Sequence, residues 1–83
     1  MPEVDLHQLR EELELIKAAV MTRLPFIASL LGKVRIYYSR HLKHPAAATI
    51  DDDIILGPEF LNFAVNAKIF ALAHEVLHIA FRD

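Results

Sequence analysis

The sequence predicts an α+β domain: a long N-terminal helix, a small antiparallel sheet of two or three strands, a short helix and a C-terminal helix. Three observations support this fold class. Apolar residues recur at steps of three and four near the N-terminus, they alternate with basic residues over 33–38, and they dominate the C-terminal segment. The chain has 83 residues, which is enough for a single domain.

The first helix is expected over residues 3–31. Pro25 should kink or restart it, because proline has no backbone N–H to donate within a helix. Gly32 follows as a residue type that commonly ends helices. Apolar side chains spaced three and four apart line one face of this helix. They are Leu6, Leu9, Leu13, Ile16, Val20 and Leu24.

An alternating segment predicts the first strand. Residues 33–38 alternate basic and apolar side chains, which is typical of a strand with one buried face. Two further strands are expected at 48–50 and 54–56, and a polar turn at 51–53 joins them. The side chains of the first strand that we expect to face inward are Val34, Ile36 and Tyr38.

Two helices are expected after the sheet. Pro58 and Glu59 favour the start of a short helix, because proline suits the first helical position and a carboxylate suits the N-terminal dipole. Asn66 is expected to cap the last helix, which is predicted from residue 67 to the C-terminus. This helix is apolar nearly all round, so we expect it to be buried.

The composition excludes several classes of protein. The chain has no Cys, which rules out disulfides, thiolate catalysis and cysteine-bound zinc. A net charge of −2 argues against a general polyanion binder, so no nucleic-acid partner is expected. The N-terminus is acidic and no apolar stretch is long enough to span a bilayer, so no membrane association is expected. The expected location is cytoplasmic.

The apolar content is high for so short a chain. Apolar residues make up 54%, compared with roughly 45–50% in typical soluble domains. Small domains usually need a disulfide, a metal or a partner subunit to supplement a thin core. We therefore expect the last helix to be covered by a second copy in a homo-oligomer or by a C-terminal segment missing from this chain.

The predicted last helix contains a motif with chemical meaning. His74 and His78 are separated by one helical turn, and Glu75 follows the first histidine, which is the HExxH spacing. Residues four apart lie on one helix face, so both imidazoles can bind one Zn²⁺ ion. Glu75 can then act as the general base that takes a proton from water. Two core histidines hydrogen-bonded to the backbone and to Glu75 are the alternative, but burial of unpaired polar groups is costly and favours the metal.

Three segments together resemble one family. They are residues 49–51 (Thr-Ile-Asp), residues 58–60 (Pro-Glu-Phe) and residues 72–78 (Leu-Ala-His-Glu-Val-Leu-His). This combination is similar to the predicted metal-dependent peptidases of the putative metallopeptidase domain family, in which a von Willebrand factor A-like domain usually follows. The resemblance covers about residues 20–83. It implies a zincin-like fold, zinc bound by His74 and His78, Glu75 as general base, and a peptide or protein substrate.

The third zinc ligand stays open at this point. A catalytic zinc typically has three protein ligands and a water. Asp83 is the candidate within the chain, although on an ideal helix it points about 140° away from His78. Another chain or a missing C-terminal segment are the other sources. Without a third ligand, the domain would be a non-catalytic metal-binding or oligomerising interaction module.

Three other polar groups each have two interpretations. Residues 51–53 are all Asp and could bind Ca²⁺ or Mg²⁺, but a polar turn is favoured. His41 and His44 could contribute to a second metal site, but a solvated loop is favoured. The basic and aromatic residues of 33–43 could contact nucleic acid, but the outer face of an edge strand is favoured. That strand could also pair with an extended substrate.

Overall fold

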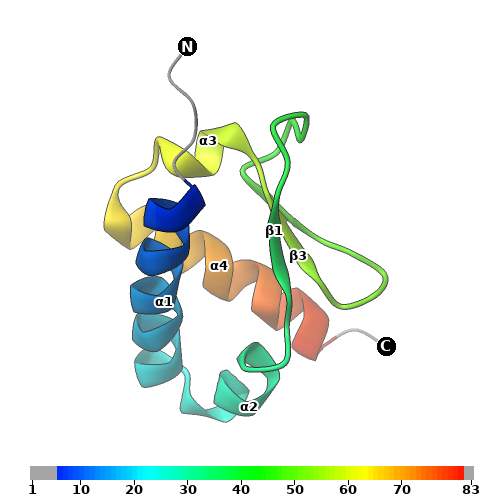
Figure 1. The fold of residues 1–83 in the computed structure, drawn as a ribbon. Helices are drawn as coiled ribbons and strands as arrows, with labels where there is room; N and C mark the ends of the chain where they lie inside the picture. The colour runs from blue at the N-terminus through cyan, green and yellow to red at the C-terminus, as the bar shows by residue number, and fades with distance from the viewer. Residues whose placement is uncertain (1–5, 82–83) are drawn as a thin grey trace.

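The computed structural model describes residues 6–81. It confirms the α+β class, with one long helix before the sheet and another after it (Figure 1). The elements are α1 (Leu6–Arg23), the 3₁₀ turn η1 (Pro25–Ile27), α2 (Ala28–Leu31), β1 (Ile36–Tyr38), β2 (Ala46–Ala48), β3 (Ile54–Leu56), α3 (Pro58–Leu61) and α4 (Val65–Ala80).

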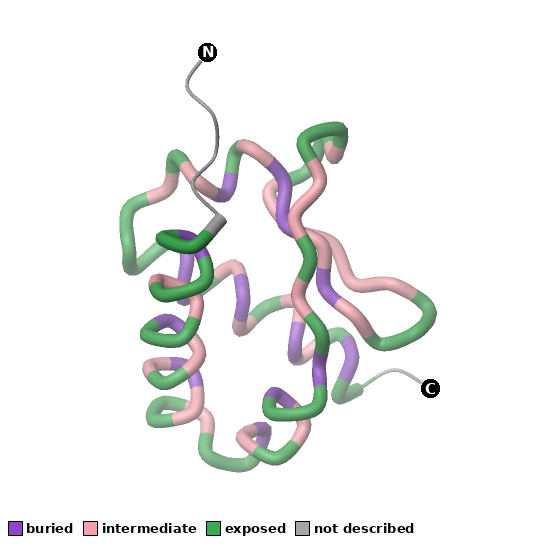
Figure 2. Tube along the Cα trace, in the orientation of Figure 1, coloured by how far each residue is buried: buried purple, intermediate pink, exposed green. Residues whose placement is uncertain are grey.

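The N-terminal helical segment is interrupted where proline predicts it. α1 ends at Arg23, and Pro25 opens a short 3₁₀ turn that leads directly into α2. From Leu9 onward the predicted stripe faces the core, with Ile16 and Val20 almost fully buried. Exposed and buried positions therefore alternate along α1 (Figure 2). The helix start expected at residue 3 lies outside the described residues.

The sheet is mixed, so the expectation of an antiparallel sheet is wrong. Its strand order is β1-β3-β2. β3 pairs parallel with β1 and antiparallel with β2. After β1 the chain crosses to the far side, reverses in β2 and returns as β3 between the other two strands. β1 and β3 therefore run in the same direction, and β1 and β2 form the two edges.

The second strand lies earlier than predicted, at Ala46–Ala48. A local turn takes the place of the predicted strand end, because the Thr49 hydroxyl accepts hydrogen bonds from the backbone N–H groups of Asp51 and Asp53. Ile50 is consequently 93% exposed at this turn. The interpretation of the acidic run as a turn is confirmed, since such side-chain to backbone bonds are typical of turns.

The start of the last helix also differs from the prediction. α4 begins at Val65, and Ala64 occupies the N-cap position with an extended backbone. Asn66 therefore lies inside the first turn, and its prediction as the cap is wrong. The short helix α3 begins as expected, with Pro58 in its first turn and Glu59 near its N-terminus.

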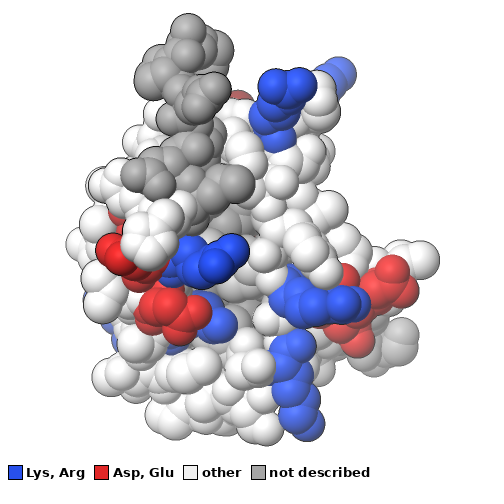
Figure 3. Space-filling model, in the orientation of Figure 1, with Lys and Arg blue, Asp and Glu red and all other residues white. Residues whose placement is uncertain are grey.

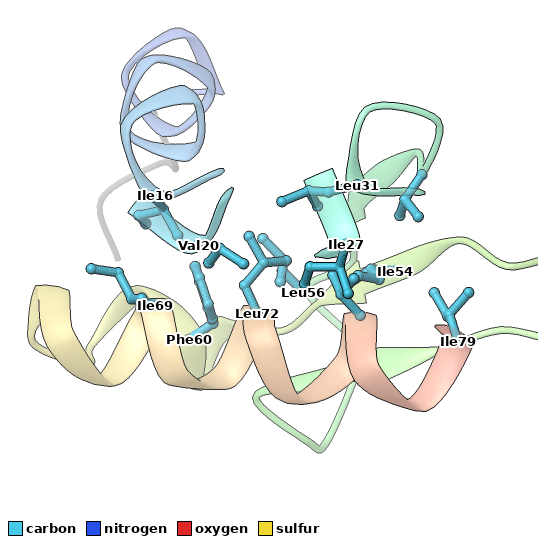
Figure 4. Close-up of a cluster of buried hydrophobic side chains, with 12 residues drawn as sticks. Ile16, Val20, Ile27, Leu31, Ile54, Leu56, Phe60, Ile69, Leu72 and Ile79 are labelled. Carbon is cyan, nitrogen blue, oxygen red and sulfur yellow. The ribbon is translucent and has the colours of Figure 1, made fainter. Parts of the chain in front are cut away.

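The core lies between α1, the α2 segment, β3 and one face of α4. Figure 4 shows apolar side chains from these elements meeting above α4. The largest fully buried side chains are Phe60, Ile16, Ile27, Leu31, Ile54, Leu56, Leu72, Val20 and Val76. No helix of the described part of the chain is long and apolar enough to cross a membrane.

One charged pair links the two long helices. Lys68 of α4 is only 7% exposed, and its ammonium donates a hydrogen bond to the carboxylate of Glu12 on α1. The same ammonium lies 5.9 Å from the centre of the Phe60 ring, within the range of a cation–π interaction. A buried ammonium needs such partners, because burial without them carries a large desolvation penalty.

A close backbone contact fixes the start of α3. A Cβ atom at Gly57 would lie 2.3 Å from the His44 carbonyl oxygen, so this position has no room for a side chain. The Gly57 N–H donates a hydrogen bond to the Pro45 carbonyl at 2.9 Å. The loop after β1 is thereby held against the end of β3.

We expect the Gly57→Ala variant to unfold at lower denaturant concentration, with stability reduced by about 1–3 kcal/mol because the loop backbone must move. Gly32→Ala is the matched control. Its Cβ would meet nothing closer than 3.6 Å and its backbone is helical, so stability should stay equal or rise by about 0.4–1 kcal/mol. Equal stability of both variants would contradict the close contact.

We expect Glu12→Gln to reduce the free energy of unfolding by about 1–3 kcal/mol, because the buried Lys68 ammonium loses its charged partner. Glu11→Gln is the control, since Glu11 pairs with His7 on the surface and such pairs contribute about 0–1 kcal/mol. Urea unfolding of both variants measures the difference. A larger loss for Glu11→Gln would show that the α1–α4 pair is not the stabilising one.

Candidate metal centre

α4 buries one face and exposes the other. Leu72 and Val76 are fully buried, whereas His74 and His78 lie on the exposed face. Within residues 6–81 the elements packed against α4 cover only one side of it, so cover of the other side by a second copy or a C-terminal segment stays a prediction. Phe70 is 73% exposed on the uncovered side. The two imidazoles are therefore accessible to solvent. The support for a metal site consequently comes from the geometry of the two rings and not from the cost of burying them.

The two histidines converge as their spacing predicts. The Nε2 atoms of His74 and His78 are 2.9 Å apart, and the two rings meet edge to face with centroids 4.5 Å apart. Two imidazole nitrogens bound to one tetrahedral zinc would lie about 3.3 Å apart, given Zn–N bonds of about 2.0–2.1 Å. The pair therefore fits two ligand positions of a single metal ion with only a small movement.

An aromatic side chain lies beside the histidine pair. Phe70 stacks on His74, with the ring planes 19° apart and the centroids separated by 6.4 Å. The three rings follow each other at one-turn intervals along the exposed face of α4, as residues four apart do. Phe70 lies four residues before His74, and this spacing could have indicated the contact between the two rings from the sequence.

Glu75 lies on the side of α4 that faces β2. It is half-buried, and together with His78 it lines a cavity of about 550 Å³ whose opposite wall is the strand Ala46–Ala48. Glu75 and His74 also line a neighbouring cavity of about 230 Å³. Glu75 thus borders one open cavity with His78 and a second with His74.

The edge of β2 borders this space. The Pro45 carbonyl and the Thr49 N–H both bond toward the β3 side. Because backbone groups alternate between the two sides of a strand, Ala46 and Ala48 present their N–H and C=O groups at the outer edge. β2 packs against α4, and its small side chains permit this approach. The sequence predicts this strand two residues too late, at 48–50, and therefore does not predict this wall of the site. The run of alanines at 46–48 was the feature that could have indicated it.

The remaining candidate ligands do not join the histidine pair. Asp83 lies outside the described residues. His41 and His44 are exposed on the loop after β1 and line neither of the two cavities, in agreement with a solvated loop. Among residues 6–81, no group of three His, Cys, Asp or Glu side chains is placed to hold a metal ion. The structure therefore brings together two candidate ligands, one fewer than the three protein ligands typical of a catalytic zinc.

The fold and the site define a small α+β domain with a pair of converging histidines and a glutamate on its last helix. The chain belongs to the family described as "Putative metallopeptidase domain", whose model matches residues 8–83. A family of metallopeptidases implies a metal cofactor. Comparison with curated proteins and with solved structures finds no match.

Proposed function

We propose that this domain is a zinc-dependent peptidase in which His74 and His78 bind the metal and Glu75 is the general base. The observation that carries this proposal is the convergence of two imidazole nitrogens on the accessible face of α4, next to a carboxylate and a free strand edge. Membership of the metallopeptidase family supports it. Zinc is the metal we favour, because neutral imidazole is among its commonest ligands.

Each residue of the site has a separate role in peptide hydrolysis. A divalent cation held by the histidines would act as a Lewis acid and make water more acidic. Glu75 accepts a proton from the attacking water at a carboxylate oxygen and afterwards donates a proton to the leaving amine. Phe70 keeps the His74 ring oriented during these steps. Glu75 is suited to this role because it is half-buried yet borders open space.

The substrate is a peptide or protein segment bound in an extended form along β2. Ala46 and Ala48 offer main-chain donors and acceptors at the sheet edge, and an added strand would pair with them. Such a strand would pass over Glu75 and His78, which form the opposite wall of the larger cavity. Main-chain pairing of this kind is largely independent of sequence, so side-chain pockets must provide specificity.

Completion of the site requires a third ligand. We propose Asp83, a second copy of the chain, or a segment outside this sequence as its source. Phe70 of α4 is 73% exposed and Phe81, which caps the end of this helix, is 71% exposed, which supports a covering partner at this end of the chain. If no third ligand is supplied, the histidine pair fits a non-catalytic metal-binding or oligomerising module instead.

We expect the 83-residue chain to bind one Zn²⁺ in a calorimetric titration, and His74→Ala or His78→Ala to weaken binding by about 100-fold or more. Both imidazoles are exposed, so the variants should stay folded and the loss should report on binding alone. His44→Ala is the control and should bind zinc as the parent does. Absence of zinc binding by the parent, or an equal loss in the control, would refute the metal assignment.

We expect zinc-loaded protein to cleave an unstructured protein substrate such as casein, and Glu75→Gln to reduce cleavage by about 10²–10⁴-fold while zinc affinity is retained. Glu59→Gln serves as the control, since Glu59 is exposed on α3 and lines neither cavity. Mass spectrometry of the products measures both. Zinc binding without cleavage in the parent protein would favour the non-catalytic module.

A further inference from the structure

The second edge of the sheet lies away from the candidate metal centre. β1 and β2 are the two edge strands, and β2 is the one that lines the cavity with Glu75 and His78. The expectation that residues 33–38 pair with the substrate therefore has no support from this arrangement, because β1 is separated from that cavity by β3 and β2. The β1 edge needs an interpretation of its own.

The outer backbone groups of β1 are available for pairing. The Arg35 carbonyl accepts a hydrogen bond from the Ile54 N–H, and the Ser39 N–H donates one to the Leu56 carbonyl, both at 2.9 Å. Backbone groups alternate in direction along a strand, so the N–H and C=O groups of Ile36 and Tyr38 point to the free edge. These are the groups with which an added strand forms hydrogen bonds.

A groove runs along this edge, between β1 and α1. Its volume is about 470 Å³, and Figure 1 shows α1 beside the side of β1 that is not paired with β3. The floor is apolar and belongs to the core, with Leu9, Val34 and Leu56 all buried. An added strand at the normal spacing of about 4.8 Å from β1 would lie in this groove and bury alternate side chains on its floor.

The rim of the groove is predominantly basic. Arg10 and Lys17 of α1 line it together with a single carboxylate, Glu14, which lies 3.7 Å from the Lys17 ammonium. No ion pair is formed by Arg10 within the described part of the chain. Arg35, which precedes β1, does not line the groove and is paired with Asp53 at 3.3 Å. Figure 3 shows Lys and Arg side chains on both the α1 side and the β1 side of this face, with Asp and Glu side chains beside them on each side.

We propose that the groove between α1 and β1 binds an extended, acidic peptide segment of a partner protein, which adds to the sheet as a strand beside β1. The free edge supplies main-chain pairing, the apolar floor accepts every second side chain, and Arg10 and Lys17 pair with its carboxylates. A second copy of the chain is disfavoured as occupant, because pairing of two β1 edges would bring the same cations toward each other.

Titration of the ¹⁵N-labelled chain with a short peptide of alternating valine and glutamate tests this proposal. We expect saturable amide shifts at Ile36, Tyr38 and the facing side of α1, and none at His74 or His78. The same peptide with lysine in place of glutamate should bind about tenfold more weakly or not at all. Absence of saturable shifts, equal binding of both peptides, or shifts centred on α4 would each overturn the proposal.

Charge-reversal variants distinguish peptide binding in this groove from nonspecific electrostatic attraction to the protein. The double variant Arg10→Glu and Lys17→Glu should bind the acidic peptide about tenfold more weakly. Arg23→Glu is the matched control, because Arg23 is exposed at the end of α1 and does not line the groove; its affinity should equal that of the parent. An equal loss in the control would overturn the proposal. Concentration-dependent shifts at Ile36 without peptide would overturn it in favour of self-association.

Discussion

The packing of one face of α4 against the core is the constraint on which the rest of the structure depends. Leu72 and Val76 are fully buried one turn apart, and this fixes the rotation of the helix about its axis. With 3.6 residues per turn, the same rotation turns positions 74 and 78 outward and places position 75 toward β2. The side chains of the candidate site are thus oriented by core residues that lie outside the site.

The sheet has two free edges, and each edge borders a different cavity. β3 occupies the centre and is anchored in the core by Ile54 and Leu56. β2 faces the histidine helix, and β1 faces the groove beside α1. Edge strands carry unpaired backbone groups and are usually protected from association. Here each edge borders a cavity, which suits the binding of extended segments on both sides of so small a sheet.

The sequence predicts those features that depend on local signals. The break at Pro25, the strand 54–56 and the start of α3 at Pro58 are confirmed, because proline geometry and apolar runs act within a few residues. The antiparallel sheet is wrong because strand order depends on distant pairing. The burial of the second face of α4 stays a prediction, because it depends on what covers the helix from outside residues 6–81. At the site, the convergence of His74 and His78 follows from helical spacing, whereas the wall formed by β2 required the tertiary structure.

The contact at Gly57 has a consequence for how this domain can vary. Pro45, which lines the smaller cavity beside His74, is held by the hydrogen bond from Gly57. The exposed residues that precede it in the loop line neither cavity of the candidate site. The bond from Gly57 joins main-chain atoms, so it does not depend on the side chains of these residues. This stretch of the loop can therefore change in sequence while Pro45 keeps its place beside His74.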